Sequence, residues 1–319
     1  MPPRDDLLAL GVNYRRIPVL AIGKDIYCDS RLILQKLEEL FPAGGLSADT
    51  PEQRATERLL QTWSVEGGVF WHTAFLVPAE IPLDEKFLKD RKSFAGINFS
   101  QEARKEQRPA AIAGMRSSLH FLESTLLADG RDFISKTEKP SLADIECKNW
   151  GSMKSMNAFI AHYQNHIRDR SLCKHAAIWP LCFISRVPNA LPEDDISSEE
   201  FPKVFAWLER FNTALSSAES ALGKPTTLAG AEAIKKIATA TFAEGSPNVD
   251  ANDPLRLKAC QEIEFWPTDT GSTHHVRGKL VKLTADEVAV AVPTKSGDEE
   301  VRIHAPRHGF HIAKADVSG

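Results

Sequence analysis

The chain has 319 residues, enough for about two domains of ordinary size. Hydrophobic residues make up 42% and charged residues 26%, a composition that excludes a chain disordered throughout. The formal net charge of −4 argues against a nucleic-acid-binding protein, which usually carries a basic stripe. No run of about 18 apolar residues and no secretion signal occur, so we expect no membrane contact. The five cysteines include no CxxC pair, which favours a reduced, cytoplasmic chain.

The first 46 residues predict a small α/β unit in the order strand, turn, strand, helix. A short β-type run at 17–22 is followed by a turn cluster at 23–25 and a return strand at 26–28. The hydrophobic period then changes to helical spacing. Asp29 and Ser30 stand where a helix N-cap belongs.

Residues 50–222 have the hydrophobic spacing of helices, so they predict an all-α domain. The segment opens at 50–53 with a capping-box sequence that has proline at the first helical position. Ser141 and Asp144 belong to a second N-terminal box, which begins a later helix.

The C-terminal segment 224–319, here called the tail, predicts one helix over about 228–243 and then a small sheet or barrel. From residue 221 onward it carries 12 basic against 13 acidic residues, which disfavours an oligonucleotide-binding barrel because phosphate contacts need excess positive charge. The expected strands are 262–266, 276–283, 287–292, 301–304 and 310–312.

Two motifs near the start resemble the glutathione-site half of the glutathione S-transferase N-terminal domain. In that family a strand entered through Val/Ile-Pro is followed by an acid-Ser pair that opens a helix. Ile17-Pro18 and Asp29-Ser30 have this form. The resemblance implies that Ile17 and Pro18 face the cysteinyl backbone of glutathione and that Asp29 and Ser30 bind its γ-glutamyl end. A helix N-terminus and a hydroxyl suit a carboxylate, and the acid suits an ammonium.

The resemblance also implies a fold class of α/β plus all-α. Residues 1–46 would be a truncated thioredoxin-like fragment, 50–222 a helical domain of the transferase type, and 224–319 a helix followed by a β-rich domain. Ser141 and Asp144 match the family's structural capping box, whose role is folding. The tail together with the first strand resembles a group of filamentous-fungal transferase-like proteins.

Two features depart from the family pattern. The residues before Pro18 are too few for the family's first strand-helix-strand unit, since such a unit takes about 30 residues. We therefore assign no catalytic residue. Residues 147–175 hold five Lys/Arg against one Asp and interrupt a helical pattern, so we interpret them as an insertion from translated intron sequence. A natural basic loop is the alternative.

The leading hypothesis is a cytoplasmic glutathione S-transferase-like protein that adds glutathione, as co-substrate, to a small apolar electrophile in detoxification or secondary metabolism. The enzyme would lower the pKa of the thiol and let the thiolate attack. Whether this form is active stays open. Trp63, Phe70, Trp71 and His72 are candidates for the electrophile pocket, although a core role fits them better. The resemblance also implies a homodimer.

Two alternatives stand beside this hypothesis: a non-catalytic binding or assembly module with the same fold, and a gene remnant that folds poorly. No metal site is expected, because strand alternation scatters tail histidines such as His304 over both faces. Cys28 precedes the acid-Ser pair, and we interpret it as a small core residue because free cysteines are usually buried.

Overall fold

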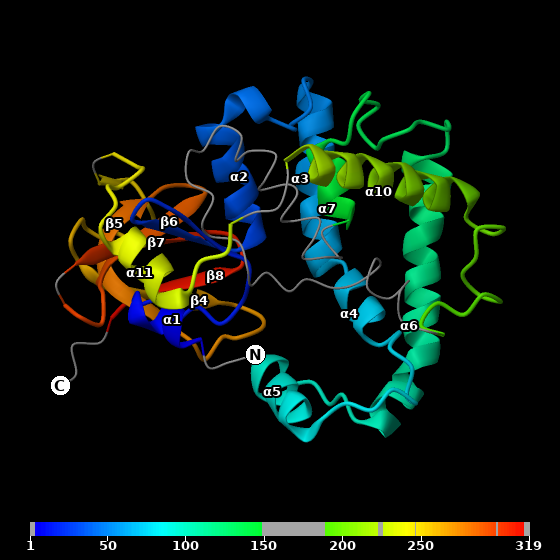
Figure 1. Ribbon diagram of the computed structural model, residues 1–319, viewed down its shortest axis with the longest axis horizontal. Coiled ribbons are helices and arrows are strands. Elements are labelled where there is room, and N and C mark those ends of the chain that lie inside the picture. The colour runs from blue at the N-terminus through cyan, green and yellow to red at the C-terminus, as the bar shows by residue number, and fades with distance from the viewer. Residues whose placement is uncertain (1–3, 149–188, 223–225, 246, 298, 316–319) are drawn as a thin grey trace.

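The computed structural model describes residues 4–148, 189–222, 226–245, 247–297 and 299–315. Most of the predicted insertion at 147–175 lies outside these residues. Figure 1 shows the strands gathered in one body together with the short helices α1 and α11, beside a second body built of the longer helices. No helix in the described residues is long and apolar enough to cross a membrane.

The helices and strands follow the predicted order along the chain. The helices are α1 (Asp5–Ala9), α2 (Ser30–Leu40), α3 (Pro51–Glu66), α4 (Val69–Ala74), α5 (Glu85–Ala95), α6 (Gln101–Phe121), α7 (Leu142–Lys148), α10 (Pro202–Leu222) and α11 (Gly230–Ala238). The strands are β1 (Val19–Ile22), β2 (Asp25–Cys28), β3 (Asn248–Val249), β4 (Glu262–Pro267), β5 (Val276–Leu283), β6 (Glu287–Pro293), β7 (Glu300–Pro306) and β8 (Phe310–Lys314).

The strands form one eight-stranded sheet in the order β1-β2-β7-β6-β5-β4-β8, with β3 paired to β5. The N-terminal hairpin and the tail meet at β2 and β7, which run parallel with Asp25 opposite Arg302 and Tyr27 opposite His304. Parallel neighbours need a long crossover, and here the crossover includes the whole helical domain. The N-terminal fragment is thus built into the sheet of the tail.

The sheet has a different core on each face of the hairpin, because successive side chains of a strand point to opposite faces. Ile26 and Cys28 pack into a core that is formed mainly by the tail strands. Leu20 and Tyr27 pack on the other face, against the apolar side of α2. Gly23 makes the hairpin turn at φ 61°, and a Cβ there would lie 2.1 Å from the Thr241 carbonyl oxygen.

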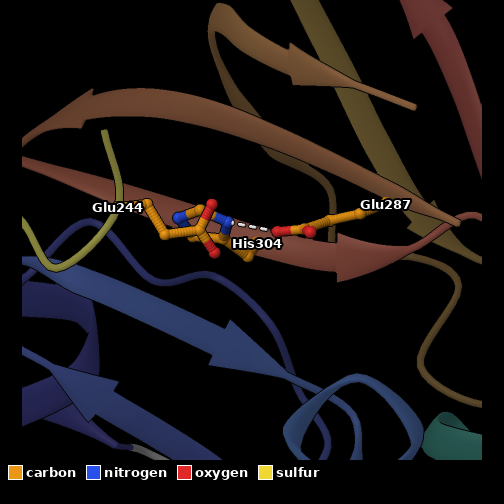
Figure 2. A group of neighbouring side chains, drawn as sticks. All are labelled: Glu244, Glu287 and His304. Carbon is orange, nitrogen blue, oxygen red and sulfur yellow. Dashed lines mark hydrogen bonds and ion pairs between the residues drawn. The ribbon is translucent and has the colours of Figure 1, made fainter. Parts of the chain in front are cut away.

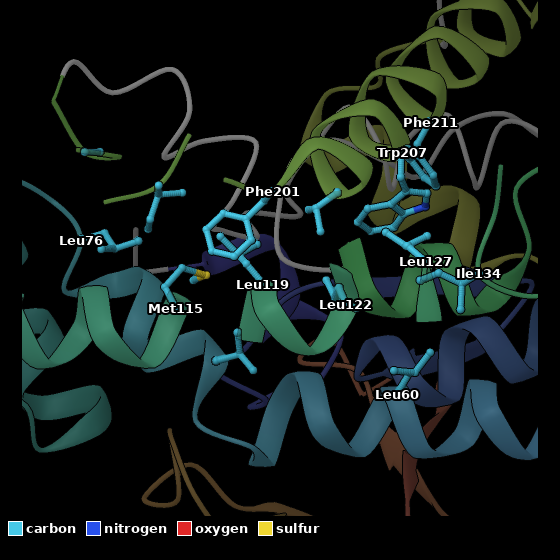
Figure 3. Packing of buried hydrophobic residues seen from close by; sticks show 14 of the residues in the cluster. Leu60, Leu76, Met115, Leu119, Leu122, Leu127, Ile134, Phe201, Trp207 and Phe211 are labelled. Atoms are coloured by element: carbon cyan, nitrogen blue, oxygen red, sulfur yellow. The ribbon is translucent and has the colours of Figure 1, made fainter. Parts of the chain in front are cut away.

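The helical domain has its own core, centred on Met115 and Leu119 of α6 and on Trp207 of α10 (Figure 3). The predicted capping box at the start of α3 is present: Thr50 accepts from the Gln53 backbone and Gln53 reaches back to the Thr50 backbone. After α6 the helix continues into the π-helical turn η2 (Leu122–Leu126), which is wider than an α-helix.

The helix expected over 228–243 is shorter in the structure and ends at Ala238. The backbone N–H groups of Ala243 and Glu244 donate instead to the Asp25 carboxylate, at 2.6 and 3.0 Å. Phe242 forms an isolated bridge with Gly23. A contact with the N-terminal hairpin therefore ends this helical pattern, and nothing local to the tail could have predicted it.

Candidate functional site

The structure brings Ile17, Pro18, Asp29 and Ser30 together at one end of the β1–β2 hairpin. Val19 pairs with Cys28 in the antiparallel register, so the next residues outward, Pro18 and Asp29, are neighbours across the hairpin. The Ile17–Pro18 peptide bond is cis. Pro18 is buried and Ile17 is half-buried. The local strand-turn-strand-helix pattern is enough to create this juxtaposition.

Asp29 caps α2 in an unusual backbone conformation. Its φ is 73°, in the left-handed region that non-glycine residues rarely adopt. Its carboxylate accepts the Arg31 N–H at 3.1 Å. Ser30, the first residue of α2, is half-buried, and the first N–H groups of a helix favour an anion. Strained residues of this kind cluster at ligand-binding sites.

Two guanidinium groups keep Asp29 ionised. Arg31 approaches both oxygens, with Nε 3.1 Å from Oδ1 and NH2 3.4 Å from Oδ2. An Arg16 nitrogen lies 3.5 Å from Oδ2. Burial acts to raise the pKa of Asp29, but the two arginines and the hydrogen bonds from Arg31 outweigh it and hold the pKa at about 2. Asp29 is therefore a buried anion at neutral pH.

The tail forms one wall of this site. Arg16 donates from NH1 to both oxygens of Asp269, at 3.0 and 3.1 Å. Gly309 lies so close to Arg31 that a Cβ on it would be 2.8 Å from a guanidinium nitrogen. His308 contacts Glu66 at the end of α3, with Nε2 2.5 Å from Oε1. Sequence reasoning missed these contacts because they join segments more than 200 positions apart.

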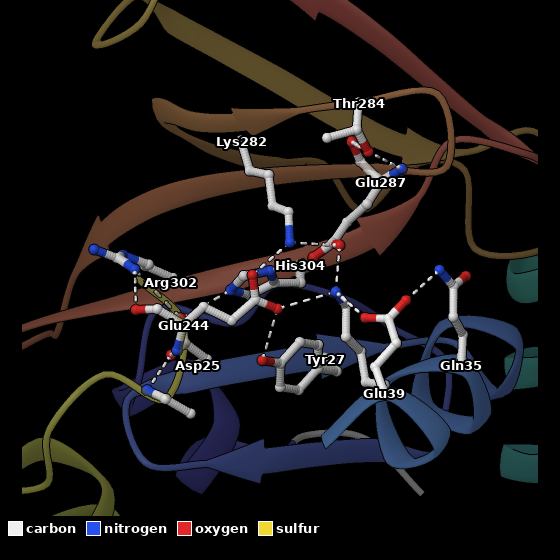
Figure 4. Close-up of polar contacts among 12 residues, drawn as sticks. Asp25, Tyr27, Gln35, Glu39, Glu244, Lys282, Thr284, Glu287, Arg302 and His304 are labelled. Carbon is white, nitrogen blue, oxygen red and sulfur yellow. Dashed lines mark hydrogen bonds and ion pairs between the residues drawn. The ribbon is translucent and has the colours of Figure 1, made fainter. Parts of the chain in front are cut away.

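A second polar cluster lies buried where β2 meets β7 (Figures 2 and 4). His304 stands between two carboxylates, with Nδ1 2.6 Å from Glu287 Oε1 and Nε2 3.0 Å from Asp25 Oδ1. Burial acts to lower the pKa of His304, but hydrogen bonds to the two carboxylates raise it. Since each ring nitrogen faces an acceptor, the ring is an imidazolium.

Two lysines balance the negative charge of this cluster. Lys36 Nζ lies 2.7 Å from Glu287 and 3.1 Å from Glu244, and Lys282 contacts the same two carboxylates (Figure 4). The acidic members are Asp25, Glu39, Glu244 and Glu287, and the basic ones are Lys36, Lys282, Arg302 and His304.

The same cluster is the place to test for a metal. Ligand atoms of Glu244, Glu287 and His304 lie within 4.8 Å of one another (Figure 2). The ammonium groups of Lys36 and Lys282, however, contact both glutamates, and both nitrogens of His304 are engaged. The protein's own cations already neutralise these carboxylates, so we assign no metal to them.

The remaining candidates divide between core and site. Burial raises the pKa of the Cys28 thiol, which is wholly buried and stays protonated. Trp63 packs against the helical core, and its ring centroid lies 5.3 Å from that of Phe121. Phe70 is 37% exposed and contacts the Trp71 ring edge-on.

Ser141 and Asp144 lie in the helical domain, away from the hairpin. Ser141 donates to Asp144 from its backbone N–H and from Oγ, both at 2.8 Å. Asp144 also accepts from the Ile134 N–H and the Trp207 indole. These contacts tie the start of α7 to a preceding loop and to α10. We infer that these contacts stabilise the fold of the helical domain.

The chain is similar to known proteins in two parts of its sequence and in its fold. Residues 1–47 match the glutathione S-transferase N-terminal domain. Residues 72–151 and 156–220 match a domain of unknown function, DUF7962. A solved GST-like protein from Pseudomonas syringae has 23% sequence identity and a TM-score of 0.62, over 99% of this chain and 87% of that one. This likeness shows the fold. No curated protein matches the sequence.

Proposed function

We propose that the chain is a member of the glutathione S-transferase superfamily and that it binds glutathione at the end of the β1–β2 hairpin, a proposal supported by the match of residues 1–47 to that family's N-terminal domain and by the fold shared with a GST-like protein. The observation that carries the proposal is the Asp29 cap with its φ of 73°, which lies beside Pro18 across the hairpin and is followed by the half-buried Ser30. Each of these features suits one part of a small anionic peptide.

Three contacts make up the proposed binding mode. The backbone of Ile17 pairs with the cysteinyl residue as an added strand would, with Pro18 beside it. The Ser30 hydroxyl and the N-terminus of α2 bind the γ-glutamyl carboxylate. Asp29 faces the γ-glutamyl ammonium, and its pKa of about 2 keeps it charged for this purpose at neutral pH.

The proposed reaction is conjugation of glutathione to a small apolar electrophile. The thiol gives its proton to solvent, and the thiolate sulfur forms a bond to an electrophilic carbon. Either a leaving group departs with its bonding electron pair, or a π-electron pair of the electrophile shifts to the neighbouring atom, which then takes up a proton. As lining of the electrophile pocket we propose Phe70 and Trp71, which follow the end of α3 where Glu66 contacts Arg31. We assign no thiol-activating group, because Tyr14 and Cys28 are buried and their pKa values are raised.

A non-catalytic binding or assembly module is the second candidate function. It is favoured by the tail, whose β7 extends the sheet at β2 and whose turn at 307–309 borders the site.

Proposed partners are glutathione, a small apolar electrophile and a second copy of the chain. We place the protein in the cytoplasm, where its free Cys28 and Cys260 stay reduced. In a filamentous fungus the reaction would serve detoxification or secondary metabolism.

Titration calorimetry with reduced glutathione tests the proposed site. We expect the wild type to bind, and Ser30→Ala and Asp29→Asn to weaken binding by about 10-fold or more, since each loses a hydrogen bond to a charged group. Ser100→Ala and Asp84→Asn are matched controls, because both residues cap other helices and should leave binding unchanged. A wild-type protein that shows no heat of binding with millimolar glutathione would contradict the proposal.

An electrophile assay on the same samples separates the two candidate functions. Glutathione conjugate formed by the wild type above the uncatalysed rate, and reduced in Ser30→Ala, supports the transferase. Binding without conjugate formation supports the binding module.

A further inference from the structure

We propose that Asp269 of the tail pairs with Arg16 in the position that a carboxylate of the ligand would take. The tail would then compete with glutathione for the binding site. This inference rests on the proposed function. It concerns residues outside the two motifs that the sequence singled out. The relevant contacts are those that the Arg16 guanidinium makes with two aromatic rings and with the carboxylates near its nitrogens.

Arg16 is fixed at the mouth of the site. It directly precedes the cis Ile17–Pro18 bond, and its side chain is 13% exposed. Its guanidinium carbon lies 5.6 Å from the Tyr14 ring centroid and 5.5 Å from that of Phe310. Two rings from different parts of the chain thus hold a planar cation in one place, as anion-binding arginines require.

The hydrogen-bonding capacity of Arg16 is only partly used. NH1 donates to Asp269, whereas Nε and NH2 are buried beside Tyr14 and Asp29 and make no hydrogen bond of good geometry with either. The Asp29 carboxylate is near NH2, at 3.5 Å, but beyond a good hydrogen bond. Buried donors without acceptors are costly, so such an arrangement indicates that an acceptor is missing. A carboxylate is the natural acceptor for a guanidinium fork.

Asp269 is suited to be displaced. It lies in the loop between β4 and β5, and its side chain is 51% exposed. If the Asp269 side chain moved away from Arg16, its carboxylate would therefore be solvated by water and would not remain buried without a partner. The loop itself stays anchored, because the Gly271 N–H donates to the Phe94 carbonyl of α5 at 2.8 Å.

Glutathione has the chemistry to take the place of Asp269. It carries two carboxylates and one ammonium, and the γ-glutamyl carboxylate would lie at Ser30 in the proposed binding mode. The second carboxylate, or the first after a small shift, can then pair with the Arg16 fork. The competing pair is partly exposed, and such pairs contribute little stability, so the tail would weaken binding without preventing it.

Calorimetric affinities for reduced glutathione test the competition. We expect Asp269→Asn to bind about 3- to 5-fold more tightly than the wild type, in keeping with the loss of an exposed ion pair. Arg16→Gln should bind about 10-fold more weakly, as for a lost hydrogen bond to a charged group. In the Arg16→Gln background, Asp269→Asn should bring no gain, since the two side chains act on each other.

Two controls keep the test interpretable. Asp286→Asn removes the carboxylate of another tail contact, the exposed pair with Arg58, and should leave affinity unchanged. Arg16→Lys retains the charge and packing in case Arg16→Gln does not fold, and should still bind more weakly because it lacks the fork. Wild-type binding that Asp269→Asn leaves unchanged overturns this inference and leaves the proposed function standing. Absence of binding in every variant overturns both.

Discussion

Asp144 is the residue on which the local structure of the helical domain most depends. Its side chain is fully buried and accepts hydrogen bonds from the Ile134 N–H, the Trp207 indole and both donors of Ser141. Burial raises the pKa of Asp144, although the hydrogen bonds from Ile134, Ser141 and Trp207 act to lower it. The donors come from three separate segments, so one side chain joins them.

We expect Asp144→Ala to lower the free energy of unfolding by about 3 kcal/mol or more, because several buried donors lose their acceptor together. Asp144→Asn keeps one acceptor oxygen and should cost less. Urea denaturation measures both. Asp286→Ala, at an exposed pair, is the control and should change stability by less than about 1 kcal/mol. A loss for Asp144→Ala no larger than that of the control would contradict this account.

At the level of elements, the buried charge cluster joins α2 and β2 to the tail. His304 of β7 is paired with Asp25 and Glu287, and burial leaves it 1% exposed. The groups that face it or its partners are Tyr27, Lys36, Glu244, Lys282 and Arg302. An imidazolium paired with two carboxylates makes the free energy of unfolding depend on pH. The imidazolium loses its charge as the pH rises, and the carboxylates lose theirs as the pH falls.

The sign of each contribution follows from its pKa. That of His304 is raised above the unfolded value of about 6.5, so its contribution is full below pH 6.5 and is lost as the pH rises through the folded value. That of Glu287 is lowered to about 2, so its contribution is full above about pH 4.5 and is lost as the pH falls toward 2. Burial opposes the shift in both residues. For His304 the hydrogen bonds and charges of Asp25 and Glu287 outweigh it, and for Glu287 those of His304, Lys282 and Lys36 do.

We therefore expect His304→Gln to destabilise the protein most below pH 6.5 and progressively less as the pH rises. Urea denaturation of the variant and the wild type between pH 5 and about 9 measures the difference. His308→Gln is the matched control, because its ring is 63% exposed. An equal cost of His304→Gln at every pH would show that folding leaves the pKa of the ring unchanged, and would contradict this account.

Elements with local signals were predictable from the sequence, and their pairing was not. The turn after β1, the Asp29 cap and the Thr50 capping box are local patterns, and the structure confirms the elements that they delimit. The parallel pairing of β2 with β7 joins residues about as far apart as the chain allows, and no local pattern encodes it. No local pattern indicates that Lys36 and Glu287 are buried, because it is distant segments that cover them.

The candidate site divides in the same way. Ile17–Pro18 and Asp29–Ser30 could be predicted because each motif is short and the hairpin brings them together. Arg16 and Asp269 could not, since their pairing depends on the path of the tail. The contacts of a residue that flanks a motif depend on which distant segment the fold packs against it.

For the whole molecule, the shared sheet predicts two cooperative units that do not follow chain order. The N-terminal hairpin contributes Ile26 and Cys28 to the tail core, whereas the helical domain has a separate core around Met115. Ile303 of β7 is fully buried and pairs directly with Ile26. Segments 19–28 and 276–314 should therefore open together, although the whole helical domain separates them in the chain.

Hydrogen exchange followed by mass spectrometry tests this unit. We expect Ile303→Ala to lower the opening free energy of peptides from both 19–28 and 276–314 by about 2–5 kcal/mol, the usual cost of such a cavity. Peptides from α6 should change much less. Met115→Ala, an equally buried residue of the helical core, should give the reverse pattern. If Ile303→Ala left peptide 19–28 as protected as before, the hairpin would belong to the helical unit instead. The β2–β7 pairing would then not be what stabilises the N-terminal hairpin.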